Sequence, residues 1–186
     1  HVHDHHTGLI PLMMQHCHQY KPTLAAVPTV LTIHNAQYQG WMDWSKSNYL
    51  PSWNTWEWGK LDWNKRINPL ASAVKCAYKV TTVSNSYLEE MRSNANGLEA
   101  LFEYEKGKCT GILNGIDNAV WDPAKDSYIE FQYNTEEAAE GKMANKKVLC
   151  NEFNLDINKP LFIFIGRLVH EKAADLLAQA IHDAVY

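Results

Sequence analysis

The stretch "PTVLTIHN", residues 28–35, decides the fold, because an apolar run rich in β-branched residues stops there at two polar ones. The run covers residues 30–33, and His34 and Asn35 follow it. Continuous runs of this kind are typical of parallel strands that are covered on both faces. The sequence therefore predicts a buried strand that ends at His34.

Three further runs repeat this pattern along the chain. The run over residues 80–83 stops at Ser84, "CTGILNGID" stops at Asn114 and Gly115, and "LFIFIGR", residues 161–167, stops at a glycine followed by Arg167. Each predicts another strand. The pair Asn114-Gly115 is also typical of tight hairpin turns, so a hairpin stays open as the alternative at that point.

Helical patterns lie between these runs. Ser86 and Glu89 match the S-x-x-E capping box, which predicts that a helix begins there. Strands that alternate with helices favour an α/β fold with a parallel sheet flanked by helices. Helical spacing of apolar residues also predicts helices over residues 11–20, 68–77, 136–153 and 173–185.

A domain boundary is predicted near Pro160. Residues 122–133 are expected to form a surface loop, and residues 154–160 a linker before the fourth run. The sequence starts at His1 rather than Met, and its last helical pattern has no stop signal. We therefore expect an internal piece of a longer protein, with part of one domain over residues 1–159 and the start of a second over residues 160–186.

Polar residues stand where the predicted strands end. In open α/β sheets, ligands bind beyond the carboxyl ends of the strands. Those ends carry His34, Ser84, Asn114 and Arg167, and Asp4 is expected to follow one more strand near the start. A series of such positions predicts a ligand-binding cleft.

Two cations follow the last run. The guanidinium of Arg167 offers a planar fork of donors that matches phosphate oxygens, and Lys172 adds a positive charge near the predicted helix start at Ala173. Exposed backbone N–H groups at a helix start also favour an anion. The alternative is that both cations are solvated and pair with Glu171 and Asp175.

Histidines crowd the start of the chain in "HVHDHH". This run superficially resembles the HxHxDH pattern of metal-dependent hydrolases, but Asp4 comes one position too early and His5 stands in its place. His16 and His18 are two apart, so they do not share a helix face. We therefore expect no metal site.

Six of the seven tryptophans gather in one region. Indole faces stack well on sugars, whereas the simpler interpretation is packing beneath a long loop. The six are Trp41, Trp44, Trp53, Trp56, Trp58 and Trp63.

Composition excludes several classes of protein. Hydrophobic residues make up 46% of the chain and charged residues 20%, which is typical of a globular protein. The net charge of -4 argues against a nucleic-acid-binding surface, and no apolar run approaches the roughly 20 residues that span a bilayer. Four cysteines without a CxxC pair predict buried free thiols in a reducing, cytoplasmic compartment.

Several motifs together resemble one family. "HVHDHHTGLIP", "TIHNAQYQG", "VTTVSNSYLEEM", "GILNGIDNAVWDP" and "IGRLVHEKAADLL" occur in the order found in bacterial glycogen synthases and starch synthases. The resemblance covers the chain from end to end. It implies the GT-B architecture, in which two Rossmann-like domains face each other across a cleft. It also implies transfer of glucose, with retention, from ADP-glucose or UDP-glucose to the non-reducing end of an α-1,4-glucan, without a cofactor or metal.

The resemblance also implies roles for individual residues. Arg167 and Lys172 match the pair that neutralises the donor diphosphate. His34 matches the cleft histidine near the transferred glucose, and Asn114 matches a hydrogen-bond partner of that sugar. Asp4 matches the aspartate of the HxHD-type motif, which lines the same cleft. No residue matches a covalent nucleophile, which fits front-face transfer.

The sequence departs from the family pattern at three positions. His5 stands where many members have tryptophan, Asn85 replaces a common proline, and Ala173 replaces a glycine. If the family's glycine allows the backbone to approach the phosphate closely, Ala173 would weaken donor binding, whereas with a negative φ alanine would favour the helix. The family's Lys-x-Gly-Gly loop and its catalytic glutamate are not in this sequence, so we expect the 186 residues alone to be inactive. A non-catalytic glucan-binding relative and another GT-B glycosyltransferase remain the alternatives.

Overall fold

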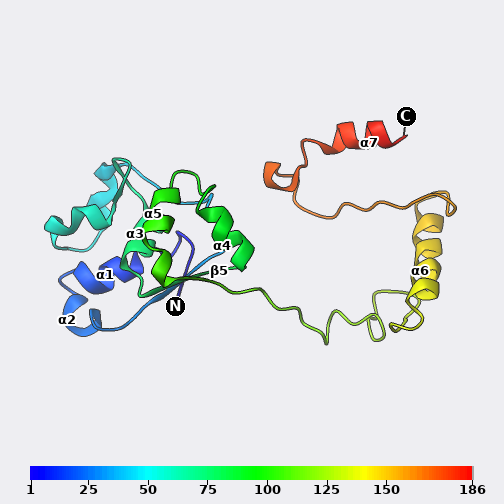
Figure 1. Ribbon diagram of the computed structural model, residues 1–186, viewed down its shortest axis with the longest axis horizontal. Coiled ribbons are helices and arrows are strands. Elements are labelled where there is room, and N and C mark those ends of the chain that lie inside the picture. The colour runs from blue at the N-terminus through cyan, green and yellow to red at the C-terminus, as the bar shows by residue number, and fades with distance from the viewer. Residues whose placement is uncertain (186) are drawn as a thin grey trace. The chain divides into compact units, whose positions relative to one another are not determined.

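The computed structural model describes residues 1–185, and the chain divides into two compact units after Gly115 (Figure 1). The first unit contains a parallel sheet of four strands in the order β1-β2-β5-β6. These strands are β1 (Val2–His3), β2 (Val30–Ile33), β5 (Lys79–Thr82) and β6 (Cys109–Gly111). The predicted α/β class, the strand ending at His34 and the strand before Asp4 are therefore confirmed.

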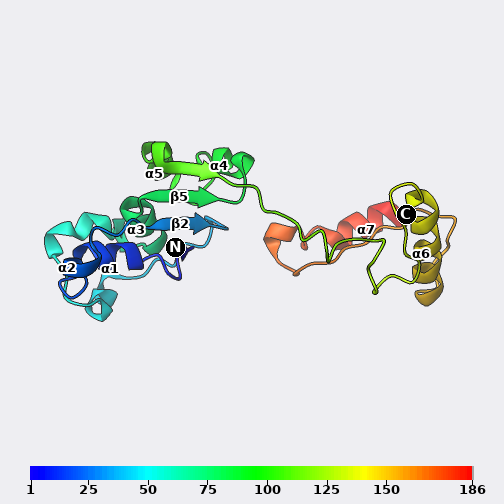
Figure 2. The ribbon, with the colours of Figure 1, turned by 90° about the horizontal axis from the view of Figure 1, so that it is seen from below.

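The register between neighbouring strands places the apolar residues of the runs opposite one another. Leu31 lies opposite Val2 on one side and Val80 on the other, and Thr82 lies opposite Gly111. Figure 2 shows β2 and β5 side by side and pointing the same way. Parallel strands have their carboxyl ends at one edge of the sheet, so His34 and Ser84 follow at that edge.

Helices connect and cover these strands. The first unit contains α1 (Ile10–His16), α2 (Lys21–Leu24), α3 (Pro69–Cys76), α4 (Asn85–Met91) and α5 (Glu99–Tyr104). Between β2 and α3, a long excursion carries the 3-10 helices η1 (Trp44–Tyr49) and η2 (Thr55–Lys60) and an antiparallel pair, β3 (Asp62–Trp63) with β4 (Arg66–Ile67). A third 3-10 turn, η3 (Lys106–Lys108), precedes β6.

Two apolar clusters hold the first unit together. The larger one joins the sheet to α3, α4 and α5, and its fully buried side chains include Leu31, Ile33, Leu70, Val74, Val80, Met91 and Phe102. The smaller one joins α1 to the tryptophan-rich excursion and contains Leu12, Leu61, Ile67 and Cys76. Each buried aliphatic or aromatic side chain contributes about 1.5–3 kcal/mol to folding.

The helix predicted over residues 11–20 ends earlier, at His16. Cys17 is extended, with ψ of 131°, and forms an isolated β-bridge with Trp53. The amide of His18 donates to the carbonyl oxygen of Ser52 at 2.9 Å. The chain leaves the helix because these bonds tie it to the tryptophan-rich excursion, and a new helix, α2, starts at Lys21 next to Pro22.

The capping-box prediction at Ser86 is wrong by two residues. Ser84 is the N-cap of α4, with φ of -169°, and its Oγ accepts a hydrogen bond from the amide of Tyr87 at 2.9 Å. Ser86 lies inside the helix. Glu89 pairs with Arg92 instead, at 2.7 Å. The prediction over residues 68–77 is confirmed by α3, where the Oδ1 of Asn68 accepts from the amide of Ala71 at 2.9 Å.

The second unit contains α6 (Ala138–Glu152), the 3-10 turn η4 (His170–Lys172) and α7 (Leu177–Val185). The helix predicted over residues 136–153 is confirmed by α6. Asn154 ends it in a left-handed conformation, with φ of 53°. The Nζ of Lys146 donates to the carbonyl oxygens of Ile157 and Lys159 at 2.7 and 2.6 Å, which ties the predicted linker back onto α6.

One predicted strand and the hairpin alternative in the second half of the chain are not observed. Residues 161–165 form no strand, and Phe162, Ile163 and Ile165 are exposed, because a parallel strand needs a neighbouring strand and the described part of this unit offers none. The hairpin alternative at Asn114-Gly115 fails for the same reason, since no described strand follows Gly115.

Candidate active site

The first element of the site is the edge where β1 and β2 end. Asp4 follows β1 with φ of 48°, and its Oδ1 accepts hydrogen bonds from the amides of His34 at 2.7 Å and Asn35 at 3.4 Å. The two residues that the sequence placed at separate strand ends are thus brought together. The carboxylate of Asp4 holds the backbone that carries the His34 imidazole.

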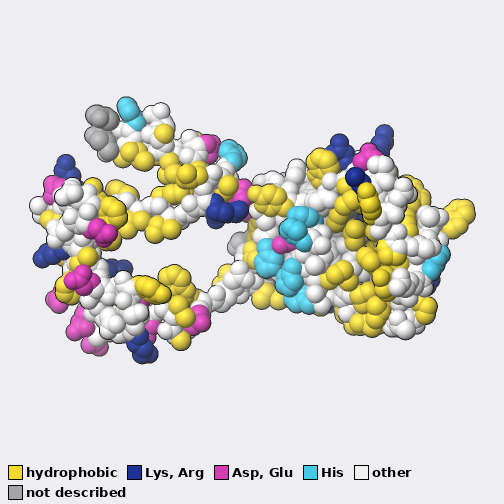
Figure 3. Space-filling model, turned by 180° about the vertical axis from the view of Figure 1, so that it is seen from behind, with side chains coloured by type: hydrophobic (Ala, Val, Ile, Leu, Met, Phe, Trp, Pro, Cys, Tyr) yellow, Lys and Arg dark blue, Asp and Glu magenta, His cyan; other side chains and the backbone are white. Residues whose placement is uncertain are grey.

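The ring of His34 has a second contact that the sequence did not reveal. Its Nε2 lies 3.1 Å from the Nδ1 of His3, the last residue of β1. Figure 3 shows that histidine side chains gather around an acidic one on this face of the first unit. Finding His3 from sequence would have required the register between β1 and β2, which no local pattern supplies.

The neighbouring loop is shaped around His5. The Nδ1 of His5 lies 3.0 Å from the carbonyl oxygen of Tyr38. Gly40 has φ of 66°, and a Cβ at Gly40 would collide with the imidazole of His5. Because glycine alone combines that φ with so close an approach, this position excludes any other residue.

A buried polar network fixes the loop after β2. The side chain of Gln39 is buried, and its Nε2 donates to the carbonyl oxygens of Ala95 and Asn96, both at 3.0 Å. Its Oε1 accepts from the Nδ2 of Asn68 at 2.8 Å. Nearby, the amide of Ala36 donates to the hydroxyl of Tyr87 at 2.9 Å, and burial raises the pKa of that phenol. These bonds hold the loop that leads away from His34.

The other polar strand ends differ in what they do. The Ser84 hydroxyl is used as the cap of α4. The strand predicted to stop at Asn114 ends earlier, at Gly111, and Asn114 is exposed beyond it. Among the described residues, no three His, Cys, Asp or Glu side chains are placed to share a metal ion.

Arg167 and Lys172 lie in the second unit, Arg167 three residues before the turn η4 and Lys172 as the last residue of that turn. Arg167 is 71% exposed and its Nη2 lies 3.3 Å from the Oε1 of Glu171, while Asp175 pairs with His170 at 3.3 Å. One of the two pairings named in the alternative interpretation, Arg167 with Glu171, is therefore present.

The prediction that a helix starts at Ala173 is wrong. Ala173 is left-handed, with φ of 54° and ψ of 30°, and α7 begins only at Leu177. The amides of Lys172 and Ala173 donate to the carbonyl oxygens of Val169 and His170, so they are used within the turn. Any anion held here would depend on the side chains.

Some of the tryptophans pack beneath the loop, and others are exposed as sugar stacking would require. Trp44 and Trp53 pack against the smaller core cluster and Trp63 against the larger one, as expected for packing beneath a loop. The guanidinium of Arg66 lies over the indole of Trp41, with its Cζ 4.0 Å from the ring centroid.

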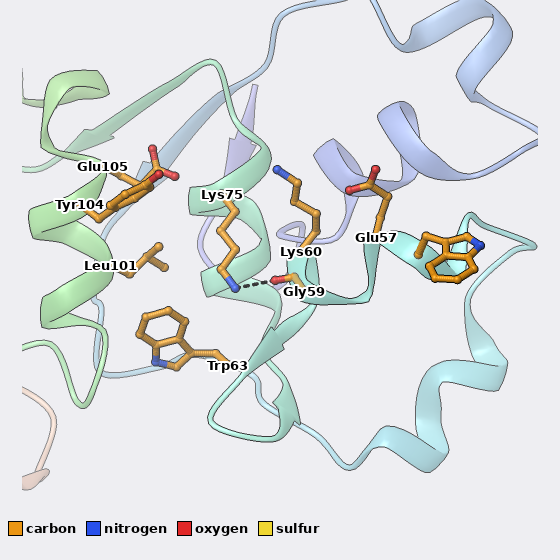
Figure 4. A pocket seen from close by; sticks show the side chains of 9 residues that line it. Glu57, Gly59, Lys60, Trp63, Lys75, Leu101, Tyr104 and Glu105 are labelled. Carbon is orange, nitrogen blue, oxygen red and sulfur yellow. Dashed lines mark hydrogen bonds between the residues drawn. The ribbon is translucent and has the colours of Figure 1, made fainter.

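Trp56 is 91% exposed and is one of the residues that line a cavity of about 450 Å³. Trp63, Tyr104 and Lys75 line the same cavity (Figure 4). The Nζ of Lys75 donates to the carbonyl oxygens of Gly59 and Asp62, and burial lowers its pKa. Lys75 and Tyr104 lie in the last turns of helices that precede strands, so this cavity is at the amino edge of the sheet, away from Asp4 and His34.

The four cysteines are free, and Cys17, Cys76 and Cys150 are buried as predicted, whereas Cys109 is only half-buried. No helix in the described part of the chain is long and apolar enough to cross a membrane.

Comparisons with known proteins agree with this architecture. A model of the starch synthase catalytic domain matches residues 1–104. A glycogen synthase from Flavobacterium johnsoniae is 53% identical over 178 residues, which cover 96% of this chain and 37% of that protein. One from Streptococcus uberis is 34% identical and aligns with 95% of this chain and 38% of that protein.

A solved structure is also similar. The catalytic domain of starch synthase IV from Arabidopsis thaliana, bound to ADP and acarbose, matches with a TM-score of 0.78 and 28% identity, over 97% of this chain and 38% of that one. The present chain thus spans just over a third of the length of these relatives. Because the family model matches more than half of its residues, the chain belongs to the starch synthase catalytic domain family.

Proposed function

We propose that this chain is part of a glycogen synthase that transfers glucose from a nucleotide-sugar to the non-reducing end of an α-1,4-glucan. The observation that carries the proposal is the 53% identity to a glycogen synthase across 96% of the chain. ADP-glucose is the favoured donor over UDP-glucose, because the similar starch synthase IV structure holds ADP.

In this reaction, the bond between the anomeric carbon of the donor glucose and the diphosphate oxygen breaks. A bond forms between that carbon and the 4-hydroxyl oxygen of the terminal acceptor glucose, and the hydroxyl proton passes to the diphosphate. Negative charge grows on the diphosphate as it leaves. Fixed positive charges that face this oxygen stabilise the transition state more than the ground state.

Some of the proposed site residues position the sugar, and others neutralise the charge of the diphosphate. His34 faces the transferred glucose, and Asp4 holds the His34 backbone through the 2.7 Å bond to its amide. Asn114 contributes a hydrogen bond to the same sugar, which its exposed position beyond β6 permits. Arg167 and Lys172 neutralise the diphosphate, and the exposure of both side chains leaves them accessible to it.

Residues 1–159 would then belong to the acceptor-side domain with its linker, and residues 160–186 would begin the nucleotide-side domain. The exposed apolar side chains of residues 162–165 support this, because such a run is stable only when neighbouring strands cover it. The four free thiols fit a cytoplasmic protein.

The test is glucose incorporation by the full-length protein, supplied with glycogen and either ADP-glucose or UDP-glucose. We expect radiolabel to enter glycogen faster from ADP-glucose, and the isolated 186 residues to transfer none. Full-length protein that incorporates glucose from neither donor would refute the transferase proposal.

A second candidate function, glucan binding without catalysis, is favoured by the exposed Trp56 beside its cavity. Affinity electrophoresis of the full-length protein in glycogen separates the two candidates. Retardation together with no transfer from either donor would favour the binding protein.

A further inference from the structure

The contact between His3 and His34 has the geometry of a well-formed hydrogen bond between two imidazoles. The Nδ1 of His3 and the Nε2 of His34 are 3.1 Å apart. The ring centroids are 5.4 Å apart and the planes differ by only 20°, so the rings lie end to end rather than face to face. The nitrogens therefore meet near the plane of both rings, where an N–H can point at a lone pair.

A bond of this kind couples the protonation of the two rings. A neutral imidazole carries its proton on one nitrogen and accepts on the other, so one of the two facing nitrogens donates and the other accepts. If His3 Nδ1 donates, the proton of His34 resides on Nδ1. Within the described residues, no hydrogen bond is formed by the Nδ1 of His34. That nitrogen is thus available to a ligand.

His3 is well fixed for such a task. It pairs with Thr32 in the sheet, and its amide donates to the Oγ1 of Thr7 at 2.7 Å, while that hydroxyl donates back to the His3 carbonyl oxygen at 2.8 Å. The ring of His1 stacks on it, with centroids 4.4 Å apart. His34 is consequently held at two points, its backbone by Asp4 and its ring by His3.

We propose that His3 is a positioning residue that sets the tautomer and orientation of His34, so that His34 Nδ1–H donates to a hydroxyl oxygen of the transferred glucose. This proposal rests on the proposed function, because it needs His34 to face the sugar. Partners that orient a functional histidine through its second nitrogen typically affect activity by about 10- to 100-fold when removed, as known for metal-bound histidines.

The test uses full-length protein with His3→Leu and His3→Asn. Leucine removes the donor, whereas the asparagine amide can place an N–H near the position of Nδ1. We expect His3→Leu to lower kcat by about 10- to 100-fold with the KM for glycogen nearly unchanged, and His3→Asn to recover most of that loss. His6→Leu is the matched control, since His6 contacts His5 and not His34, and kcat should stay at the wild-type value.

Two further measurements separate failure of this inference from failure of the proposed function. The ¹⁵N shifts of the His34 ring should report an Nδ1–H tautomer in the wild type and a mixture in His3→Leu. In the His34→Ala background, His3→Leu should cause no further loss of kcat.

Three results would overturn the inference while leaving the transferase intact. These are a normal kcat in His3→Leu, equal losses in the Leu and Asn variants, and additive losses in the double variant. A normal kcat in His34→Ala would instead remove His34 from the proposed function, and His3 with it.

Discussion

Ala173 has a strained backbone conformation and directly follows Lys172, which we propose binds the donor diphosphate. Its φ of 54° is left-handed, a conformation that costs an L-residue roughly 1–2 kcal/mol. The alternative in which a negative φ lets alanine favour the helix is therefore excluded. Lys172 directly precedes Ala173, so the turn that carries this cation ends in a backbone conformation that alanine disfavours.

Replacement of Ala173 with glycine should relieve that strain. Glycine regains about 0.4–1 kcal/mol of entropy in the unfolded chain, so we expect a net gain of at most about 1 kcal/mol in the free energy of unfolding of the full-length protein. Urea denaturation measures it. Ala174→Gly is the matched control, because Ala174 has no positive φ and should lose stability instead. Equal changes in both variants would contradict the strain at Ala173.

Cys76 makes stability depend on pH. Burial raises the pKa of its thiol to about 11, above the ordinary value of about 8.5. The folded protein holds this proton more tightly, so its contribution to stability is complete below the unfolded pKa and is lost as pH rises toward 11. The loss is about 1.4 kcal/mol per pH unit within that window.

We therefore expect the free energy of unfolding to fall less steeply between pH 9 and 11 in Cys76→Ala than in the wild type. Denaturation at several pH values measures both slopes, and the comparison of slopes removes the constant cost of the smaller side chain. Parallel slopes would show that the Cys76 thiolate is as stable in the folded protein as in the unfolded one.

At the scale of elements, the sequence predicts well where the chain supplies its own partners. Residues 30–33 and 80–82 form strands because they are hydrogen-bonded to each other as neighbours in the sheet. Residues 161–165 are also apolar but form no strand. Helix boundaries depend on contacts that no local pattern contains. The bridge between Cys17 and Trp53 ends α1, and the extended backbone at Ser84 makes it the cap of α4 in place of Ser86.

The site follows the same rule. Asp4, His34 and Ser84 could be predicted from local sequence to follow strands, whereas Arg167 follows no described strand and β6 ends three residues before Asn114. His3 and the Gln39 network could not be predicted, because they depend on register and on contacts between loops far apart in the chain.

The cap of α4 can be tested directly. Ser84→Ala removes the acceptor of the Tyr87 amide and should lower the free energy of unfolding by about 1 kcal/mol. Ser86→Ala removes a hydroxyl within the helix and should change it by less than about 0.5 kcal/mol. Thermal or urea denaturation of both variants decides the matter. A larger loss in Ser86→Ala would restore the capping box that the sequence predicted.

At the scale of the whole molecule, the proposed chemistry needs two parts of the chain. The first unit supplies a histidine held by Asp4 and His3. The second supplies two exposed cations, Lys172 on the turn η4 and Arg167 before that turn. The similarity to the Flavobacterium johnsoniae glycogen synthase covers 96% of the chain and so includes both parts. The central claim is that Arg167 acts on the diphosphate of the donor.

The most direct test of that claim is the rate of glucose transfer from ADP-glucose to glycogen by full-length Arg167→Ala, measured beside glycogen affinity. Lys125→Ala is the matched control, since Lys125 is 77% exposed and pairs with one carboxylate, that of Asp122, as Arg167 does with Glu171. Loss of one or two charge-assisted bonds should lower kcat/KM for ADP-glucose by about 10- to 100-fold or more in Arg167→Ala, with glycogen affinity and Lys125→Ala nearly unchanged. Equal loss of transfer and glycogen binding in Arg167→Ala, or wild-type transfer, would contradict the account.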